Sequence, residues 1–288
     1  MKMFIKKLFM ADFRFIKNNK TWVILAPRRA KRPDEIEKKS LSCPFCDPKK
    51  DEIIESKNGV LVLKNKFPFA KIHEIIVHSS SHHKNFDELE ILQVENIFNV
   101  FKVRFNLHKT KGHVVIFHNF GHEAGASVAH PHSQIVVVPF ETSLDIAPEN
   151  YDKNIFEISD NAFLISCPEN SQWPDEVWIS LKKGNKNFGE LNDLETRDLA
   201  FILRKTIKLL DLRHGHDFSY NFYITPTANF YLRIIPRQKK IGGFELATNI
   251  YVNTQEPTQT LAFLKKHWNL KDNESISLEH KAEYKTGV

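Results

Sequence analysis

One order of predicted elements occurs twice along this chain of 288 residues. A strand, a helix and two further strands are predicted near residues 74–139, and the same order returns near residues 176–236. The helices are marked by apolar residues three to four positions apart, and the strands by short alternating or wholly apolar runs. We therefore expect two copies of one α+β unit, packed as a pseudo-dimer within the chain.

The boundaries of these elements follow from the same patterns. Helices are predicted over residues 87–108 and 193–212, and residues 27–33 form a basic loop. Strands are predicted over residues 21–26, 60–65, 74–78, 113–119, 135–139, 176–181, 218–224 and 230–236. We expect an N-terminal half over residues 1–150 and a C-terminal half over residues 151–288, with the chemistry kept in the first half.

Composition excludes several classes of protein. The chain is 41% hydrophobic and 26% charged, as is usual for a globular protein, and it contains no apolar run of the ~20 residues that a membrane span needs. Its first ten residues lack the apolar stretch of a secretory signal, and three cysteines do not make a disulfide framework. These features predict a cytoplasmic protein. The net charge of +6 favours partners that carry phosphate, without choosing between nucleic acid and small nucleotides.

Histidine is concentrated in one part of the chain. Ten of the 14 histidines lie between His73 and His132. Cys43 and Cys46 form a C-x2-C pair, which can hold a tetrahedral zinc ion if two further ligands are supplied. The pair can also be a redox couple or two unpaired thiols, so the spacing alone leaves three interpretations open. The candidate histidine ligands are His73, His78, His82, His83, His118, His122, His130 and His132.

The run HNFGHEAGASVAHPHSQIVVVP, over residues 118–139, is typical of chemistry at phosphorus. His130, His132 and Gln134 alternate along an extended chain and therefore point to one side. A loop of small residues precedes them, and such loops let backbone N–H groups approach phosphate oxygens. A neutral imidazole there can attack phosphorus and pass the phosphoryl group to an acceptor. The alternative is a pair of buried histidines bonded to backbone carbonyls.

HPHSQ resembles the signature of the histidine-triad superfamily, in the branch of galactose-1-phosphate uridylyltransferase and ADP-glucose phosphorylase-like proteins. Four further stretches resemble that branch in the same order: TWVILAPRRAKRP, CPFC, HSSSHHKNFDEL and FYLRIIPRQKKIGGFELATNIYVN. The similarity covers roughly residues 12–264. It implies two tandem histidine-triad-like units, each an antiparallel sheet with helices, related by a pseudo-twofold axis.

The resemblance also implies roles for particular residues. Structural zinc would be held by Cys43, Cys46, His82 and His130. His132 would be the nucleophile that accepts a nucleoside monophosphate, and Gln134 would hydrogen-bond the phosphoryl group. The substrate would be contacted by Arg29, Arg32, Asn65, Phe67, Asn119, Gly121, Ser127, Lys239, Phe244 and Glu245. In dimers of the family some of these groups reach across the subunit interface, so a homodimer is expected.

The sequence departs from the family pattern at three places. Lys66 stands where uridylyltransferases usually have an acidic residue, which leaves the base open. Asn229 and its neighbours offer no histidines for the second metal site of some uridylyltransferases, so none is expected. His82 and His83 are adjacent, and either can be the third zinc ligand.

We therefore predict an enzyme, a nucleotidyltransferase that moves a nucleoside monophosphate from a sugar nucleotide to a sugar 1-phosphate or to phosphate through a nucleotidyl-histidine. One alternative is a phosphorylase or hydrolase of dinucleotides or nucleoside diphosphate sugars on the same scaffold. Another is a non-catalytic, zinc-stabilised protein that binds nucleotides or RNA. A nucleic-acid partner is not expected, because the aromatic residues fall in strand cores and not in surface runs interleaved with lysine and arginine.

Overall fold

The computed structural model describes residues 14–18, 21–32, 43–145, 155–157, 161–183, 185–216 and 218–271 of the chain. Its twelve described strands are β1 (Arg14–Asn18), β2 (Thr21–Leu25), β3 (Ile53–Lys57), β4 (Val60–Lys64), β5 (His73–Val77), β6 (His113–Phe120), β7 (His132–Val138), β8 (Ile155–Glu157), β9 (Phe163–Ser166), β10 (Val177–Leu181), β11 (Tyr220–Ile224) and β12 (Tyr231–Pro236). The α-helices are α2 (Ile91–His108), α3 (Asp193–His214), α4 (Gly243–Thr248) and α5 (Pro257–His267). Short 3-10 helices are η1 (Pro27–Lys31), η2 (Lys50–Glu52), η3 (His122–Ala124) and η4 (Phe188–Glu190).

Ten strands form one sheet, in the order β3-β4-β5-β7-β6-β11-β12-β10-β9-β8, and every pairing in it is antiparallel. The order β5-β7-β6 in the first half is repeated in reverse as β11-β12-β10 in the second, with α2 and α3 at corresponding places in the chain. The α+β class with a large antiparallel sheet is confirmed. The strand order is the one that two related units joined edge to edge would give, and the pseudo-twofold axis and the boundary at residue 150 stay predictions.

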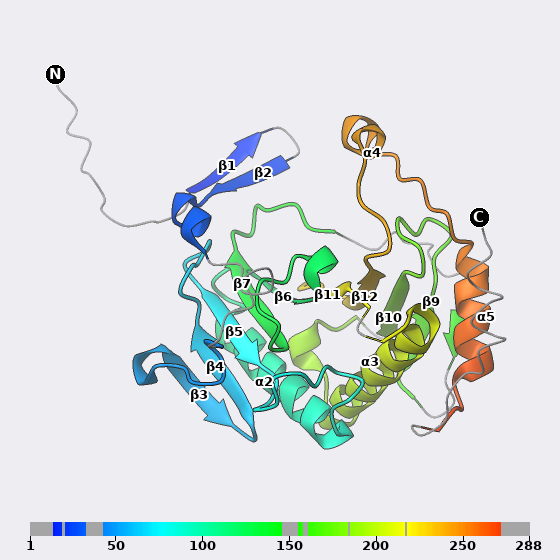
Figure 1. The fold of residues 1–288 in the computed structure, drawn as a ribbon, viewed down its shortest axis with the longest axis horizontal. Helices are drawn as coiled ribbons and strands as arrows, with labels where there is room; N and C mark the ends of the chain where they lie inside the picture. Colours follow the sequence, from blue (N-terminus) through cyan, green and yellow to red (C-terminus); the bar gives the residue numbers. More distant parts are fainter. Residues whose placement is uncertain are drawn as a thin grey trace.

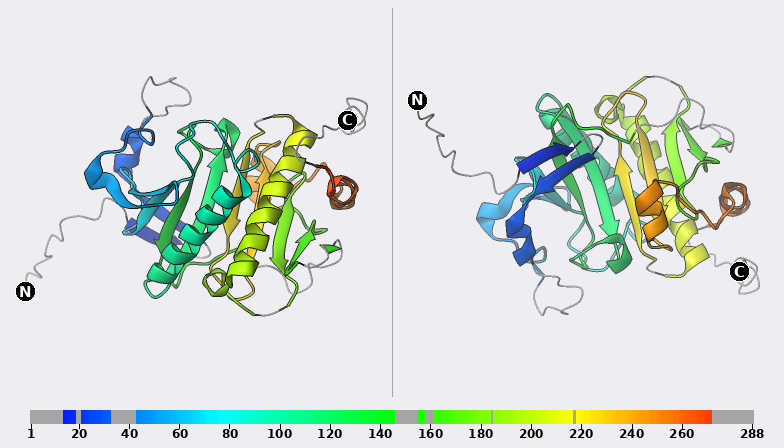
Figure 2. Two further views of the ribbon diagram at one scale, coloured as in Figure 1. Left: turned by 90° about the horizontal axis from the view of Figure 1, so that it is seen from below. Right: turned by 90° about the horizontal axis from the view of Figure 1, so that it is seen from above.

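The two long helices lie against one face of this sheet. Figure 2 shows α2 and α3 side by side across that face, with the β1–β2 hairpin and α4 on the opposite side. Alternate residues of β6 (Val114, Ile116) and β7 (Ile135, Val137) join the helices in the main hydrophobic core, all of them buried. The residues between them on each strand therefore face away from the helices. We call that side the open face.

Segments beyond the sheet lie at its ends and above the open face. The β1–β2 hairpin and α4 stand apart from each other above the sheet, and α5 lies at the β8 end, where it contacts α3 and β8 (Figure 1). No helix among the described ranges has both the length and the apolar character that a bilayer span requires.

Most predicted boundaries differ from the structure by one to three residues, as at β7, which begins at His132 and not at residue 135. The helix predicted from residue 87 begins at Ile91, because residues 85–89 form turns in which Glu88 and Leu89 both donate to the carbonyl of Asn85. The basic loop at residues 27–33 contains the 3-10 helix η1, in which proline occupies an initial position that needs no N–H donor.

Candidate active site and metal centre

Four side chains from three segments converge at a possible metal centre. The ligand atoms of Cys43, Cys46, His82 and His130 all lie within 4.8 Å of one another. Nδ1 of His130 is 3.6 Å from Sγ of Cys43 and 3.5 Å from Sγ of Cys46, and Nδ1 of His82 is 3.3 Å from Sγ of Cys46. A tetrahedral zinc ion with ordinary bond lengths places its sulfur and nitrogen ligands about 3.5 Å apart. The cluster therefore has the chemistry and the spacing to bind a metal ion.

A hydrogen bond next to the cluster fixes the tautomer of His130 that a metal ion requires. Nε2 of His130 donates to the carbonyl oxygen of Ser79 at 2.9 Å, which leaves Nδ1 unprotonated on the side of the thiols. Of the two adjacent histidines, His82 brings its ring nitrogen into the cluster, and the exposed His83 packs edge-on against the His82 ring.

His132 begins β7, two residues after the ligand His130. Its Nδ1–H donates to the carbonyl oxygen of His130 at 2.9 Å, so the neutral ring carries its free electron pair on Nε2. Burial lowers the pKa of His132 to about 4, and the imidazole is neutral near pH 7. The ring of Phe45, within the CPFC turn, packs 4.8 Å from the His132 ring, centroid to centroid. The metal centre and the candidate nucleophile are thus held by one turn.

A second set of histidines lies behind β7, on the side of the helices. Nδ1 of His118 donates to the carbonyl oxygen of His132 at 2.9 Å, and Nε2 of His78 lies 2.9 Å from Oγ of Ser133. Both rings are fully buried and stack on each other at 5.2 Å. Burial lowers the pKa of His118 to about 3. These histidines support the backbone of the HPHSQ strand and do not reach the open face.

Gln134 has a partner that the motifs did not indicate. Oε1 of Gln134 lies 2.9 Å from Nε2 of His73 on β5, and the same nitrogen lies 2.9 Å from Nδ2 of Asn65. Burial lowers the pKa of His73 to about 4, and the positive charges of Arg29 and Arg32 act in the same direction. The hydrogen bond that Nε2–H of His73 donates to Oε1 of Gln134 opposes them. The side-chain carbonyl of Gln134 therefore accepts from His73, and the amide N–H groups of Gln134 point away from His73.

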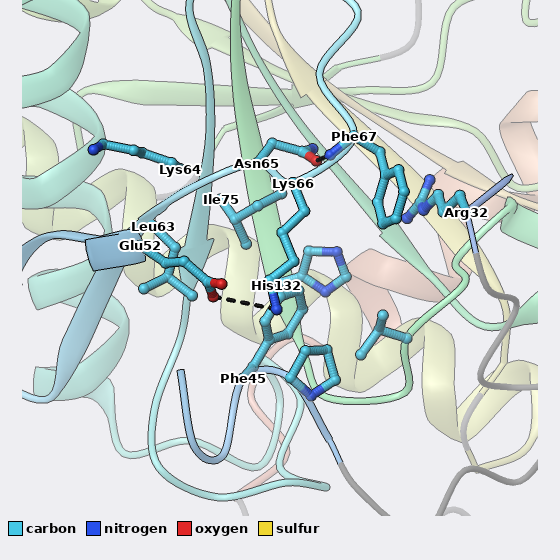
Figure 3. A pocket seen from close by; sticks show the side chains of 12 residues that line it. Arg32, Phe45, Glu52, Leu63, Lys64, Asn65, Lys66, Phe67, Ile75 and His132 are labelled. Atoms are coloured by element: carbon cyan, nitrogen blue, oxygen red, sulfur yellow. Dashed lines mark hydrogen bonds and ion pairs between the residues drawn. The ribbon is translucent and has the colours of Figure 1, made fainter. Parts of the chain in front are cut away.

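A cavity of about 250 Å³ opens beside His132. Its walls are mostly apolar, and its polar side is formed by Arg32, Asn65, His132 and an ion pair of Lys66 with Glu52 at 3.3 Å (Figure 3). The apolar lining comes from Pro44, Phe45, Leu63, Phe67, Ile75 and Val128. A concave apolar site with a few converging polar groups is typical of small-molecule binding.

The structure places three of the ten sequence-predicted substrate residues in the lining of this cavity. Arg32, Asn65 and Phe67 line the cavity, whereas Arg29 supports it from behind by donating to the carbonyl oxygen of Phe67 at 2.6 Å. Asn119 lies on β6, opposite Asn221 of β11. Gly121 and Ser127 bracket the small-residue loop that leads to HPHSQ, and the buried Oγ of Ser127 has no hydrogen-bond partner among the described residues.

The three residues predicted from the second half do not line the cavity. Lys239 pairs with Glu245 at 3.0 Å and donates to the carbonyl oxygen of Val252 at 2.8 Å, and Phe244 is 53% exposed. All three belong to the segment around α4, which projects from the sheet (Figure 1). Their contact with substrate, within one chain or across a homodimer, stays a prediction.

Comparison with known proteins agrees with this geometry. A family model described as the domain of unknown function DUF4931, N-terminal domain, matches residues 26–139. The chain is 24% identical over 306 residues to ADP-glucose phosphorylase of Arabidopsis thaliana, covering 82% of this chain and 87% of that protein. It is 24% identical over 253 residues to galactose-1-phosphate uridylyltransferase of Thermotoga maritima, covering 73% and 79%.

Solved structures give the same result for the fold. The structure of ADP-glucose phosphorylase from Arabidopsis thaliana with bound ADP-glucose has a TM-score of 0.68 at 22% identity, covering 88% of this chain and 99% of that one. The fold is therefore that of the galactose-1-phosphate uridylyltransferase-like proteins. The homologues and structural neighbours of the chain include ADP-glucose phosphorylase and galactose-1-phosphate uridylyltransferase-like proteins, so the resemblance predicted from the motifs is confirmed.

Proposed function

We propose that this protein transfers a nucleoside monophosphate from a nucleoside diphosphate sugar to phosphate or to a sugar 1-phosphate, through a covalent intermediate on His132. The observation that carries the proposal is the state of this ring. His132 is neutral, its Nδ1–H is committed to the carbonyl of His130, and it lines the 250 Å³ cavity with Arg32 and Asn65.

The first step would be attack of Nε2 of His132 on the α-phosphorus of the donor. A phosphorus–nitrogen bond forms, and the bond from the α-phosphorus to the bridging oxygen breaks, so a sugar 1-phosphate leaves. The ring becomes cationic, and its Nδ1–H bond to the His130 carbonyl is strengthened by that charge. The amide of Gln134 donates to a phosphoryl oxygen, because its carbonyl is already engaged by His73.

In the second step an acceptor oxygen attacks the same phosphorus and the bond to Nε2 breaks. With a sugar 1-phosphate as acceptor the enzyme is a uridylyltransferase-like transferase, and with inorganic phosphate it is a phosphorylase. We propose that the metal is zinc and that it holds the CPFC turn and its Phe45 against His132. No step of the transfer passes through the metal.

A phosphorylase of ADP-sugars is the second candidate, and the similarity to a protein named ADP-glucose phosphorylase favours it. The ion pair of Lys66 with Glu52 gives the cavity a cationic donor next to a carboxylate acceptor. Adenine can satisfy both through its amino group and a ring nitrogen, and uracil can do so through N3–H and a carbonyl oxygen, so this ion pair fits either base.

The test is to incubate the protein with ADP-, UDP- and GDP-sugars and to read covalent modification by intact mass. We expect one donor to add one nucleoside monophosphate per chain in an acid-labile bond. His132→Ala should form no adduct while keeping its fold and its metal content. Turnover that needs phosphate identifies a phosphorylase, and turnover that needs a sugar 1-phosphate identifies a transferase. An active His132→Ala protein, or salt-sensitive RNA binding without any adduct, would contradict the proposal.

A further inference from the structure

The two halves of the chain meet at the pairing of β6 with β11, next to the candidate nucleophile. In this pairing Asn119 lies directly opposite Asn221, and in the pairing of β6 with β7 His118 lies opposite Ser133. The β6–β7 ladder ends at this pair, and Asn119 and His132 are the next residues beyond it on the two strands. The side chains of Asn119, Asn221 and His132 therefore share the open face, one on each of three neighbouring strands.

We infer that Asn221, in the second half, is a positioning residue for the active-site loop of the first half; the inference rests on the proposed function. Nδ2 of Asn221 donates one hydrogen to the end of β6 and the other to the active-site loop, residues 121–127, that follows β6. One goes to Oδ1 of Asn119 at 2.8 Å and the other to the backbone carbonyl oxygen of Ala124 at 2.8 Å. Ala124 ends η3, within the small-residue loop that leads to HPHSQ.

These two bonds fix the direction of the Asn119 amide. The carbonyl of Ala124 can only accept a hydrogen bond, so the group that Asn221 presents must be its NH2. Asn119 must then turn its oxygen toward Asn221, and its own NH2 is directed to the other side. A developing negative charge on a phosphoryl group beside His132 is stabilised by an N–H donor and opposed by a carbonyl oxygen. Asn221 therefore sets whether Asn119 presents its N–H groups or its oxygen.

Two further contacts from the second half hold the same loop. Gly121 has a φ of +81°, and a Cβ there would meet Oγ of Ser219 at 2.1 Å. The backbone of the loop therefore lies directly against Ser219, the residue before β11. Lys240 pairs with Glu123 at 3.1 Å. The loop is thus fastened to the second half at three successive places, and Asn221 makes the contact that reaches a candidate substrate residue.

Asn221→Asp separates a positioning role from a merely structural one. Aspartate has nearly the same shape but only accepts hydrogen bonds, so Asn119 must turn its NH2 toward position 221 and its oxygen toward the phosphoryl group. We expect Asn221→Ala to slow adduct formation on His132 about 10-fold and Asn221→Asp about 100-fold, with a much smaller change in donor affinity. In an Asn119→Ala background, Asn221→Asp should cost about 10-fold less, because no amide remains to be turned.

Asn106→Asp is the matched control. Nδ2 of Asn106 also joins the two halves, donating to the carbonyl oxygen of Gly189 at 2.8 Å, but it does so from α2 on the helix side of the sheet. It should leave the rate of adduct formation unchanged. Folding of each variant is followed by its thermal midpoint and metal content.

The possible results are distinct. Adduct formation at the wild-type rate in Asn221→Asp would overturn the inference about Asn221 and leave the proposed function standing. Equal losses in the alanine and aspartate variants, with no coupling to Asn119, would also overturn it by showing a structural role. If the wild-type protein forms no adduct with any donor, the proposed function is wrong and the inference falls with it.

Discussion

At the scale of single residues, His73 fixes one group on the open face, the carbonyl of Gln134. Its Nδ1 accepts from the backbone N–H of Phe69, so the neutral ring carries its hydrogen on Nε2 and donates it to Oε1 of Gln134 at 2.9 Å. His73 is 5% exposed. A group in this position fixes the carbonyl of Gln134 and leaves the amide hydrogens for the phosphoryl oxygen. The ring is neutral, since its pKa is lowered to about 4 mainly by burial, so it holds Gln134 by hydrogen bonding and not by charge.

We therefore predict that His73→Ala lowers kcat for nucleotidyl transfer about 10- to 100-fold and changes KM for the donor less. His73→Gln should recover part of the loss, because its amide N–H can reach Oε1 of Gln134. Steady-state kinetics of the three proteins, with metal content as a control, makes the comparison. Equal kcat in the glutamine and alanine variants would mean that His73 only fills space.

The residues of the site that sequence predicts best are neighbours along the chain. His132 and Gln134 alternate on β7, so their common direction follows from strand geometry alone, and His130 lies just before the strand. His73 and Asn221 belong to other strands. Their places beside Gln134 and Asn119 depend on the register of β5 against β7 and of β6 against β11, which no local pattern shows.

At the scale of elements, the CPFC turn connects the metal centre to the cavity. Cys43 and Cys46 are its two ends, and Phe45 between them lines the cavity against His132. Cysteine spacing predicts such a turn, whereas the packing of Phe45 on the His132 ring does not follow from spacing. Element types were predictable where apolar periodicity was long, as in α2 and α3. The short strands β1, β3, β8 and β9 and the helices α4 and α5 were not predicted, because their patterns are brief or mostly polar.

We predict that removing the metal slows adduct formation on His132 by at least about 10-fold, since the turn that positions Phe45 is released. Alkylating reagents should then modify Cys43 and Cys46, which a bound metal protects. Cys167 should stay unmodified until the protein unfolds, because it is fully buried and burial raises the pKa of its thiol.

Peptide mapping after alkylation, with and without a chelator, measures this directly. Cys167→Ala serves as the control and should keep about one metal ion per chain. Equal labelling of Cys43 before and after chelation would show that the four residues hold no metal in solution.

At the scale of the whole molecule, the halves share one continuous sheet and one hydrophobic core. Residues of α2 and α3 occur in the same core cluster, as do residues of β6 and β11. The first half supplies the candidate metal ligands, the candidate nucleophile and the residues that line the cavity. The second half continues the sheet from β11 and contacts Asn119 and Ala124 of the first half through Asn221, so we expect the isolated first half to be a poor catalyst.

The buried histidines predict how the stability of this whole unit depends on pH. An unfolded histidine has a pKa near 6.5, whereas the pKa of His73 is lowered to about 4 and that of His118 to about 3 in the folded protein, chiefly by burial. The unfolded state therefore binds more protons below pH 6.5. The stability that these two groups contribute is fully present above pH 6.5 and is lost as the pH falls toward their folded values.

Each such group lowers the free energy of unfolding by about 1.4 kcal/mol per pH unit between those limits, so the pair accounts for about 3 kcal/mol per unit between pH 6 and 4. Urea unfolding at pH 7.5, 6.5, 5.5 and 4.5 measures the slope. His73→Gln removes one of the two groups and should reduce the slope by about 1.4 kcal/mol per unit, while leaving the curve flat above pH 6.5. Parallel curves for the two proteins would show that His73 is protonated equally in the folded and unfolded states. The hydrogen bond from a neutral His73 ring to Gln134 would then be excluded.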